Sequence, residues 1–148
     1  MGDVAANRAL IERFWADLYR RDFDAVGAYF TEAGEYTDVP TPADDVARGP
    51  VEIAARLRLG LAPLARIGHE IRRIVADADA VVTEHVERWE WPSGESVSLP
   101  FVSIHEVRDG RLVRWWDYWD LQTLMGAAPA WWVEHVMRGY QLTRSPSE

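Results

Sequence analysis

The stretch "SLPFVSIHEVRDGRLVRWWDYWDL", residues 98–121, gives the clearest fold signal in the chain. Apolar and aromatic residues lie on both sides of "RDGR", and an Asp-Gly pair in that setting is typical of a β-hairpin turn. We therefore expect two antiparallel strands here. Residues 69–91, "HEIRRIVADADAVVTEHVERWEW", predict two more strands joined by the "ADAD" turn. The second half of the chain should thus form a β-meander.

The first half follows a helical period instead. Apolar residues recur at helical spacing within residues 5–20, which predicts an amphipathic helix. Asp22 suits the N-cap of a short second helix over residues 23–30, and Pro50 suits the first turn of a third helix that ends near Pro63. The residues we expect this third helix to bury are Val51, Ile53, Ala54, Leu57 and Leu61.

The remaining segments complete the architecture. Residues 35–39, "EYTDV", predict a short strand, residues 40–50 a loop rich in Pro and Asp, and residues 126–140 a C-terminal helix. Helices gathered on one face of an antiparallel sheet give an α+β class protein. We expect a cone-shaped α+β roll, with three N-terminal helices over the concave face of a curved sheet and a pocket inside.

Composition narrows the domain organisation and the partners. The 148 residues suit one domain over 1–142, with residues 143–148 as a disordered tail. A formal net charge of -8 argues against nucleic-acid binding. No apolar run reaches the length of a membrane span, and the start of the sequence shows no secretory signal, so we expect a cytoplasmic protein. The chain has no cysteine but eight tryptophans, which often line apolar pockets or interfaces.

Strand parity groups a set of polar residues. Along the last strand, Asp117 shares a face with Trp115 and Trp119, so it should point inward between them. A lone buried carboxylate is costly unless it is paired. Residues two apart on other strands could supply partners on the same face. The candidate site is therefore Tyr36, Asp38, Arg88, Glu90 and Asp117.

Each of these placements has a simpler alternative. Asp117 could lie on the outer face beside Arg114 or Arg111 if a bulge changes the parity. Arg88 and Glu90 could form an exposed cross-strand charge pair. Asp38, just before "VPTP", could be a turn residue.

The order "EYTD … ERWEW … VRDGRLVRWWDYWDL" resembles limonene-1,2-epoxide hydrolase and its relatives in the SnoaL-like, nuclear-transport-factor-2-like superfamily. The family typically has E-G-K-I-x-x-W-R-D-Y-F-D-L where this chain has residues 109–121, and E-R-V-D where it has residues 87–90. The resemblance covers roughly residues 5–125. It implies a one-step, metal-free opening of an epoxide by water.

The resemblance also implies a role for each candidate. Asp117 matches the base that activates water, and Tyr36 matches a tyrosine that holds that water. Arg88 matches the arginine that bridges two acids, and Glu90 falls where the family has the aspartic acid that protonates the epoxide oxygen. Asp38 falls where the family has a water-holding asparagine. A neutral Asp38 could hold water in the same way, whereas an ionised Asp38 could itself be the base.

Other functions stay open within this superfamily. Ketosteroid isomerase uses an aspartate where Asp38 lies. That enzyme also needs a tyrosine and a protonated aspartate as oxyanion donors, and the matching positions here are Phe14 and Ser103. Both donors are therefore missing, which disfavours that activity. SnoaL-type polyketide cyclases and epoxide-opening cyclases also use a carboxylate base. The third alternative is a non-catalytic domain that binds small molecules.

The prediction is a cofactor-independent epoxide hydrolase that forms a vicinal diol from an apolar epoxide. Neither a metal nor an organic cofactor is needed for this reaction. The resemblance implies a homodimer, formed through the outer sheet face where Trp116 and Tyr118 should point. The expected substrate-contacting residues are Phe14, Trp15, Val86, Trp115 and Trp119.

Overall fold

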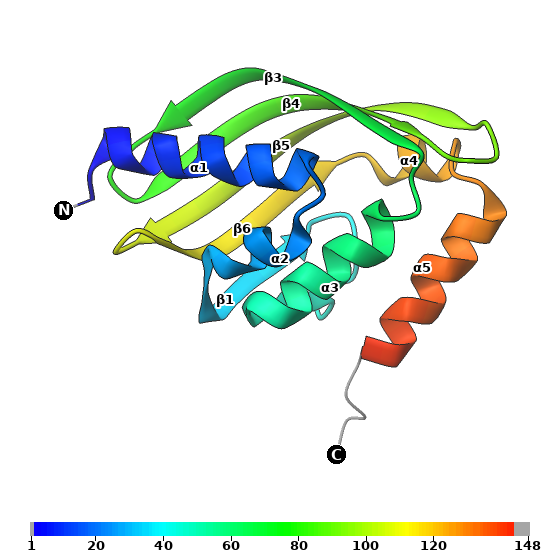
Figure 1. Ribbon diagram of the computed structural model, residues 1–148, viewed down its shortest axis with the longest axis horizontal. Coiled ribbons are helices and arrows are strands. Elements are labelled where there is room, and N and C mark those ends of the chain that lie inside the picture. Colours follow the sequence, from blue (N-terminus) through cyan, green and yellow to red (C-terminus); the bar gives the residue numbers. More distant parts are fainter. Residues whose placement is uncertain (1, 144–148) are drawn as a thin grey trace.

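The computed structural model describes residues 2–143, and within them one mixed sheet curves around a group of helices (Figure 1). The helices are α1 (Val4–Tyr19), α2 (Phe23–Ala28), α3 (Gly49–Leu61), α4 (Leu121–Met125) and α5 (Ala130–Thr143). The strands are β1 (Phe30–Asp38), β2 (Val46–Arg48), β3 (Arg66–Ala76), β4 (Ala80–Glu90), β5 (Ser96–Arg108) and β6 (Arg111–Trp119). The predicted α+β class is confirmed.

The sheet order is β2-β1-β6-β5-β4-β3. The predicted meander forms β3 to β6 with antiparallel neighbours, whereas β1 joins the edge of β6 in parallel. Asp109 and Gly110 both adopt positive φ at the β5–β6 turn, as the "RDGR" signal predicts. The parallel pairing places Asp38 directly beside Asp117, so the topology itself brings two carboxyls together.

The elements differ from the prediction in several places. The second helix ends at Ala28, because Phe30 already pairs with Leu112 in the sheet and is fully buried. The predicted loop of residues 40–50 contains β2, and α4 was not predicted. Val51 is 83% exposed, so its predicted burial is wrong, whereas the other four predicted residues of α3 are buried. The predicted tail lies outside the described residues apart from Thr143, which ends α5.

The hydrophobic core lies between the concave face of the sheet and the helices α1, α2 and α3 (Figure 1). Phe14 and Trp15 of α1 pack edge-on against Trp115 of β6, at ring-centroid distances of 5.0 and 5.9 Å. Tyr118 is exposed on the outer face, and dimerisation through that face stays a prediction. None of the described helices is both long and apolar enough to cross a membrane.

Candidate active site

A cavity of about 400 Å³ opens between the concave face of the sheet and the helices α1, α3, α4 and α5. Its wall is mostly apolar and includes Trp15, Leu57, Phe101, Trp115 and Trp119. Three carboxyl groups from the sheet, Asp38, Glu87 and Asp117, also line it. An apolar pocket with a few convergent polar groups is the usual form of a small-molecule site.

Asp38 and Asp117 meet at one phenol. The Tyr36 hydroxyl lies 2.9 Å from Oδ1 of Asp38 and 3.4 Å from Oδ2 of Asp117. The Tyr36 ring stacks on Trp115 at 3.8 Å, which fixes the phenol in place. The phenol has a single hydrogen, so it can donate to only one of the two acids. It can hydrogen-bond to both when the other acid is protonated and donates its own hydrogen to the phenol oxygen.

Further donors hold each carboxyl in position. Asp117 accepts hydrogen bonds from the Ser103 hydroxyl and from Nε1 of Trp115, the latter at 2.6 Å. Asp38 accepts one from Nε1 of Trp119 at 3.0 Å. The structure thus places Tyr36, Asp38 and Asp117 together on the inner face, as strand parity predicted.

Burial and charge act differently on these two acids. Burial raises the pKa of Asp117 well above its usual range, and the nearby Asp38 charge raises it further. Burial also raises the pKa of Asp38, but hydrogen bonds from Trp119 and Tyr36 and the charge of Arg56 oppose this rise. Asp117 therefore keeps a proton more readily than Asp38, and the pair favours one shared negative charge.

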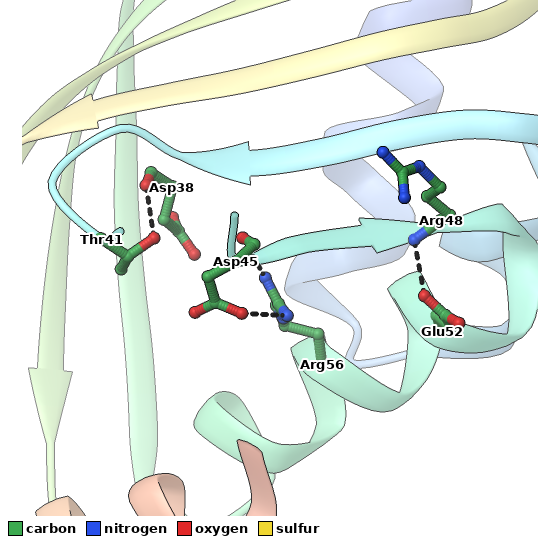
Figure 2. A network of polar contacts seen from close by, with 6 residues as sticks. All are labelled: Asp38, Thr41, Asp45, Arg48, Glu52 and Arg56. Carbon is green, nitrogen blue, oxygen red and sulfur yellow. Dashed lines mark hydrogen bonds and ion pairs between the residues drawn. The ribbon is translucent and has the colours of Figure 1, made fainter. Parts of the chain in front are cut away.

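Arg56 brings positive charge to this end of the cavity. Figure 2 shows its guanidinium against Asp45, near Asp38. It donates to Oδ1 of Asp45 at 2.7 Å and to the Asp45 carbonyl at 3.0 Å, and both side chains are nearly buried. Thr41 donates to the Asp38 carbonyl at 2.7 Å, which closes the turn after β1. This network fixes the chain that carries Asp38.

The predicted placement of Arg88 and Glu90 is wrong. Both side chains lie on the outer face and are more than half exposed. Arg88 lies 3.9 Å from Glu70, and Glu90 lies 3.5 Å from Arg66. They belong to exposed ion pairs, the simpler alternative named above. Arg88 therefore does not bridge Asp117 to a second acid.

The opposite face of β4 points inward instead and carries Glu87. Glu87 is 7% exposed and lines the cavity. It accepts hydrogen bonds from the Tyr19 hydroxyl at 3.0 Å and from Nε1 of Trp89 at 2.7 Å. Burial raises the pKa of Glu87 to about 7. Glu87 is absent from the site predicted from the sequence, although it shares strand parity with two tryptophans, Trp89 and Trp91.

Only some of the expected substrate-contacting residues line the cavity. Trp15, Trp115 and Trp119 line the cavity. Phe14 does not line it and is fully buried in the core. Val86 lies on the opposite face of β4 from Glu87 and is absent from the cavity wall.

Comparisons with known proteins agree with this architecture. The sequence pattern of the SnoaL-like domain matches residues 11–115. An epoxide hydrolase described as LEH-like, from Mycobacterium tuberculosis, is 26% identical, with a TM-score of 0.69 over 97% of this chain and 98% of that one. No curated protein matches the chain.

Two further solved structures share the fold at lower identity. The epoxide hydrolase/cyclase-like enzyme SalBIII is 16% identical, with a TM-score of 0.70 over 83% of this chain and 97% of that one. A nuclear-transport-factor-2-like protein of unknown function from Burkholderia pseudomallei is 20% identical, with a TM-score of 0.74 over 84% of this chain and 98% of that one. With a matching pattern that spans most of the described residues, the chain belongs to the SnoaL-like domain family.

Proposed function

We propose that this protein is a cofactor-independent epoxide hydrolase, which adds water to an apolar epoxide to give a vicinal diol. The observation that carries this proposal is the pair Asp38 and Asp117, joined by Tyr36 inside an apolar cavity. The similarity to the LEH-like epoxide hydrolase supports it, since that similarity covers nearly the whole chain.

The reaction needs a base for water and an acid for the ring oxygen. Water held by Tyr36 and the acid pair gives a proton to the ionised carboxylate and forms a bond to a ring carbon. The carbon–oxygen bond of the ring breaks, and the released oxygen takes a proton from an acid. The acid loses one proton and the base gains one, so the step balances. Proton exchange with solvent then restores the protonation states of both groups.

We assign the base to Asp38 rather than to Asp117. Asp117 is the more buried of the two, and its pKa is raised further. The charge of Arg56 acts to lower the pKa of Asp38. The resemblance implies the reverse assignment, with Asp117 as the base. This chain departs from the family at Asp38, where an amide is replaced by a group that can accept a proton.

The cavity indicates the class of epoxide. Its volume of about 400 Å³ suits a compact cyclic or aryl-substituted molecule. Trp15, Trp115 and Trp119 give flat apolar contact surfaces, so we expect substrates without charge.

The test is a panel of apolar epoxides incubated in oxygen-18 water. Diol that carries one oxygen-18 atom is the expected product. If the protein opens none of the panel, epoxide hydrolysis is ruled out for this substrate class.

Ring closure inside the substrate is a second candidate function. Asp38 is the observation that favours it, because an ionised carboxylate at the cavity wall could deprotonate a substrate hydroxyl instead of water. The same experiment separates the two functions. A hydroxy-epoxide converted to a cyclic ether without oxygen-18 would indicate a cyclase.

A further inference from the structure

Glu87 lines the same cavity as the two aspartates, but it comes from a different part of the sheet. It belongs to β4, whereas Asp117 belongs to β6 and Asp38 to β1. Strand β5 separates β4 from β6, and its Leu99 and Phe101 line the cavity. Neighbouring strands lie ~4.8 Å apart, so the backbones of β4 and β6 are ~10 Å apart. The two acids are also offset along the strands, because Glu87 pairs with Leu99 of β5 whereas Asp117 pairs with Ser103. Both acids line one cavity of about 400 Å³, which has room for a small substrate in contact with them.

Epoxide opening by water has a directional requirement. The attacking oxygen and the leaving oxygen lie on opposite sides of the carbon, so the acid must approach from the side away from the base. Asp117 shares the Tyr36 hydroxyl with Asp38 and therefore lies on the side of the water. Inverting glycosidases meet a similar requirement with two carboxyls roughly 6.5–9.5 Å apart.

We propose that Glu87 is the catalytic acid, which gives its carboxyl proton to the epoxide oxygen as the ring opens. This inference rests on the proposed hydrolase function and adds a residue to it. The resemblance gives the acid role to Glu90. In this proposal Glu87, on the inward face of the same strand, has that role instead. In the balanced step, Asp38 gains the proton of water, and Glu87 loses its proton to the alkoxide.

The surroundings of Glu87 suit a carboxyl that is protonated in part of the molecules at neutral pH. Burial is the main cause of its raised pKa of about 7, and no ion pair to Glu87 occurs among the described residues. The titratable groups around it or around the cavity are Tyr19 of α1, Asp38 of β1, Asp45 before β2, Arg56 of α3, His69 of β3, His85 on the same face of β4, Asp117 of β6 and Tyr140 of α5.

Tyr19 acts as a positioning residue for this acid. Its hydroxyl donates to Glu87 at 3.0 Å, and its ring stacks on His69 at 3.6 Å, which fixes the phenol beside the carboxyl. A hydrogen bond that the carboxylate accepts favours its ionised form. Loss of the Tyr19 hydroxyl should therefore raise the pKa of Glu87 and weaken the hold on its orientation.

The experiment compares Glu87→Gln with Glu90→Gln, the same chemical change on the same strand but on the exposed face. Both variants and the wild type are assayed over pH 5–9 with two epoxides, one alkyl-substituted and one with a trifluoromethyl group beside the leaving oxygen. The expected loss in kcat/KM for Glu87→Gln on the alkyl epoxide is ~10²- to 10³-fold. Glu90→Gln should behave as wild type.

Two readouts separate an acid from a structural residue. The trifluoromethyl group stabilises the leaving alkoxide, so the loss caused by Glu87→Gln should shrink by ~10-fold or more on that substrate. The wild-type rate should also fall as pH rises through about 7, and this fall should be absent in Glu87→Gln. Tyr19→Phe should move the fall to higher pH.

The outcomes distinguish this inference from the function on which it rests. A wild type that opens no epoxide overturns the hydrolase function, and the Glu87 inference falls with it. An active wild type with Glu87→Gln as active as Glu90→Gln overturns the Glu87 inference alone. An equal loss on both epoxides with an unchanged pH profile also overturns that inference alone. If Glu87→Gln does not fold, the pH shift in Tyr19→Phe decides, and no shift overturns the inference.

Discussion

Two groups of buried titratable side chains lie on the inner face of the sheet, and they have opposite environments. His85 and His105 pack beneath α1, whereas Asp38, Glu87 and Asp117 face the cavity. Each histidine lies against aromatic rings, while each acid is held by hydrogen-bond donors. Burial alone therefore does not mark the site. The site is marked by carboxyls that both face the cavity and accept hydrogen bonds from neighbouring side chains.

The histidines are held neutral. Burial lowers the pKa of both His85 and His105 to about 3. The His105 ring lies 4.7 Å from Phe14 and 5.5 Å from Trp115, and neither of its nitrogens has a hydrogen-bond partner among the described residues. Neither histidine lines the cavity. They serve as flat core residues, and we assign them no chemical role.

The two groups should shift stability with pH in opposite directions. A carboxyl whose folded pKa is raised contributes stability that is present at low pH and lost as pH rises through the folded pKa. A histidine whose folded pKa is lowered contributes stability that is present above its unfolded pKa and lost as pH falls toward the folded pKa. The titration ranges of Glu87 and of the two histidines overlap between about pH 4.5 and 6.5, so the two effects on stability oppose each other there.

The largest expected effect is on catalysis. Asp38→Asn removes the proposed base but keeps its shape, so kcat/KM for epoxide opening should fall by ~10³-fold. Asp117→Asn should lose less, because Asp117 holds a proton and an amide can replace that donor. Steady-state assays of both variants measure the difference. The opposite result, an active Asp38→Asn and an inactive Asp117→Asn, would restore Asp117 as the base.

A histidine variant tests the other group. His105→Phe keeps an aromatic ring between Phe14 and Trp115 but cannot be protonated. Relative to the wild type, it should gain up to about 4 kcal/mol of stability as pH falls from 6.5 toward 3. Urea unfolding at pH 4 and pH 7 measures this change. The same gap at both pH values would show that His105 does not limit acid stability.

Glu87→Gln should have the reverse pH dependence. The pKa of Glu87 rises from 4.5 to about 7 on folding, so its favourable contribution is complete below pH 4.5 and disappears as pH rises through about 7. Between pH 4.5 and 8, the variant should gain about 3 kcal/mol relative to wild type. Urea unfolding at both pH values tests this, with Glu90→Gln as the exposed control. A difference that does not change with pH would contradict a buried, titrating Glu87.

The contrast between β6 and β4 explains how far the sequence predicts the site. On β6, Trp115 and Trp119 flank Asp117 on one face while Arg114 and Tyr118 occupy the other, so parity points Asp117 inward. On β4, both faces carry apolar residues, since Val86 and Trp89 are both buried on opposite sides. Parity then does not decide which face of β4 points inward. The family resemblance favoured the face that carries Arg88 and Glu90, whereas in the structure the face that carries Glu87 points inward.

The fold was more predictable than the site because it depends on many residues at once. Alternation along a strand and helical spacing each repeat the same signal over roughly ten positions, about the length of the long strands and helices, and the hairpin turn adds a local signal to the strands. The encounter of Asp38 with Asp117, by contrast, depends on the parallel pairing of β1 with β6. Those residues lie far apart in the chain, and no local pattern specifies their register.

The smallest expected effect comes from Arg88→Ala, and it tests the inverted parity of β4 directly. If Arg88 bridged two buried acids, its loss would leave them unpaired, and both activity and stability would fall sharply. In the structure, Arg88 is exposed and lies 3.9 Å from Glu70, which is a weak surface pair. The change in unfolding free energy should stay within about 0.5 kcal/mol, with kcat/KM unchanged. Urea unfolding and epoxide assays at pH 7 measure both quantities. A large loss of both would mean that β4 presents its other face to the cavity, and would return Arg88 and Glu90 to the site in place of Glu87.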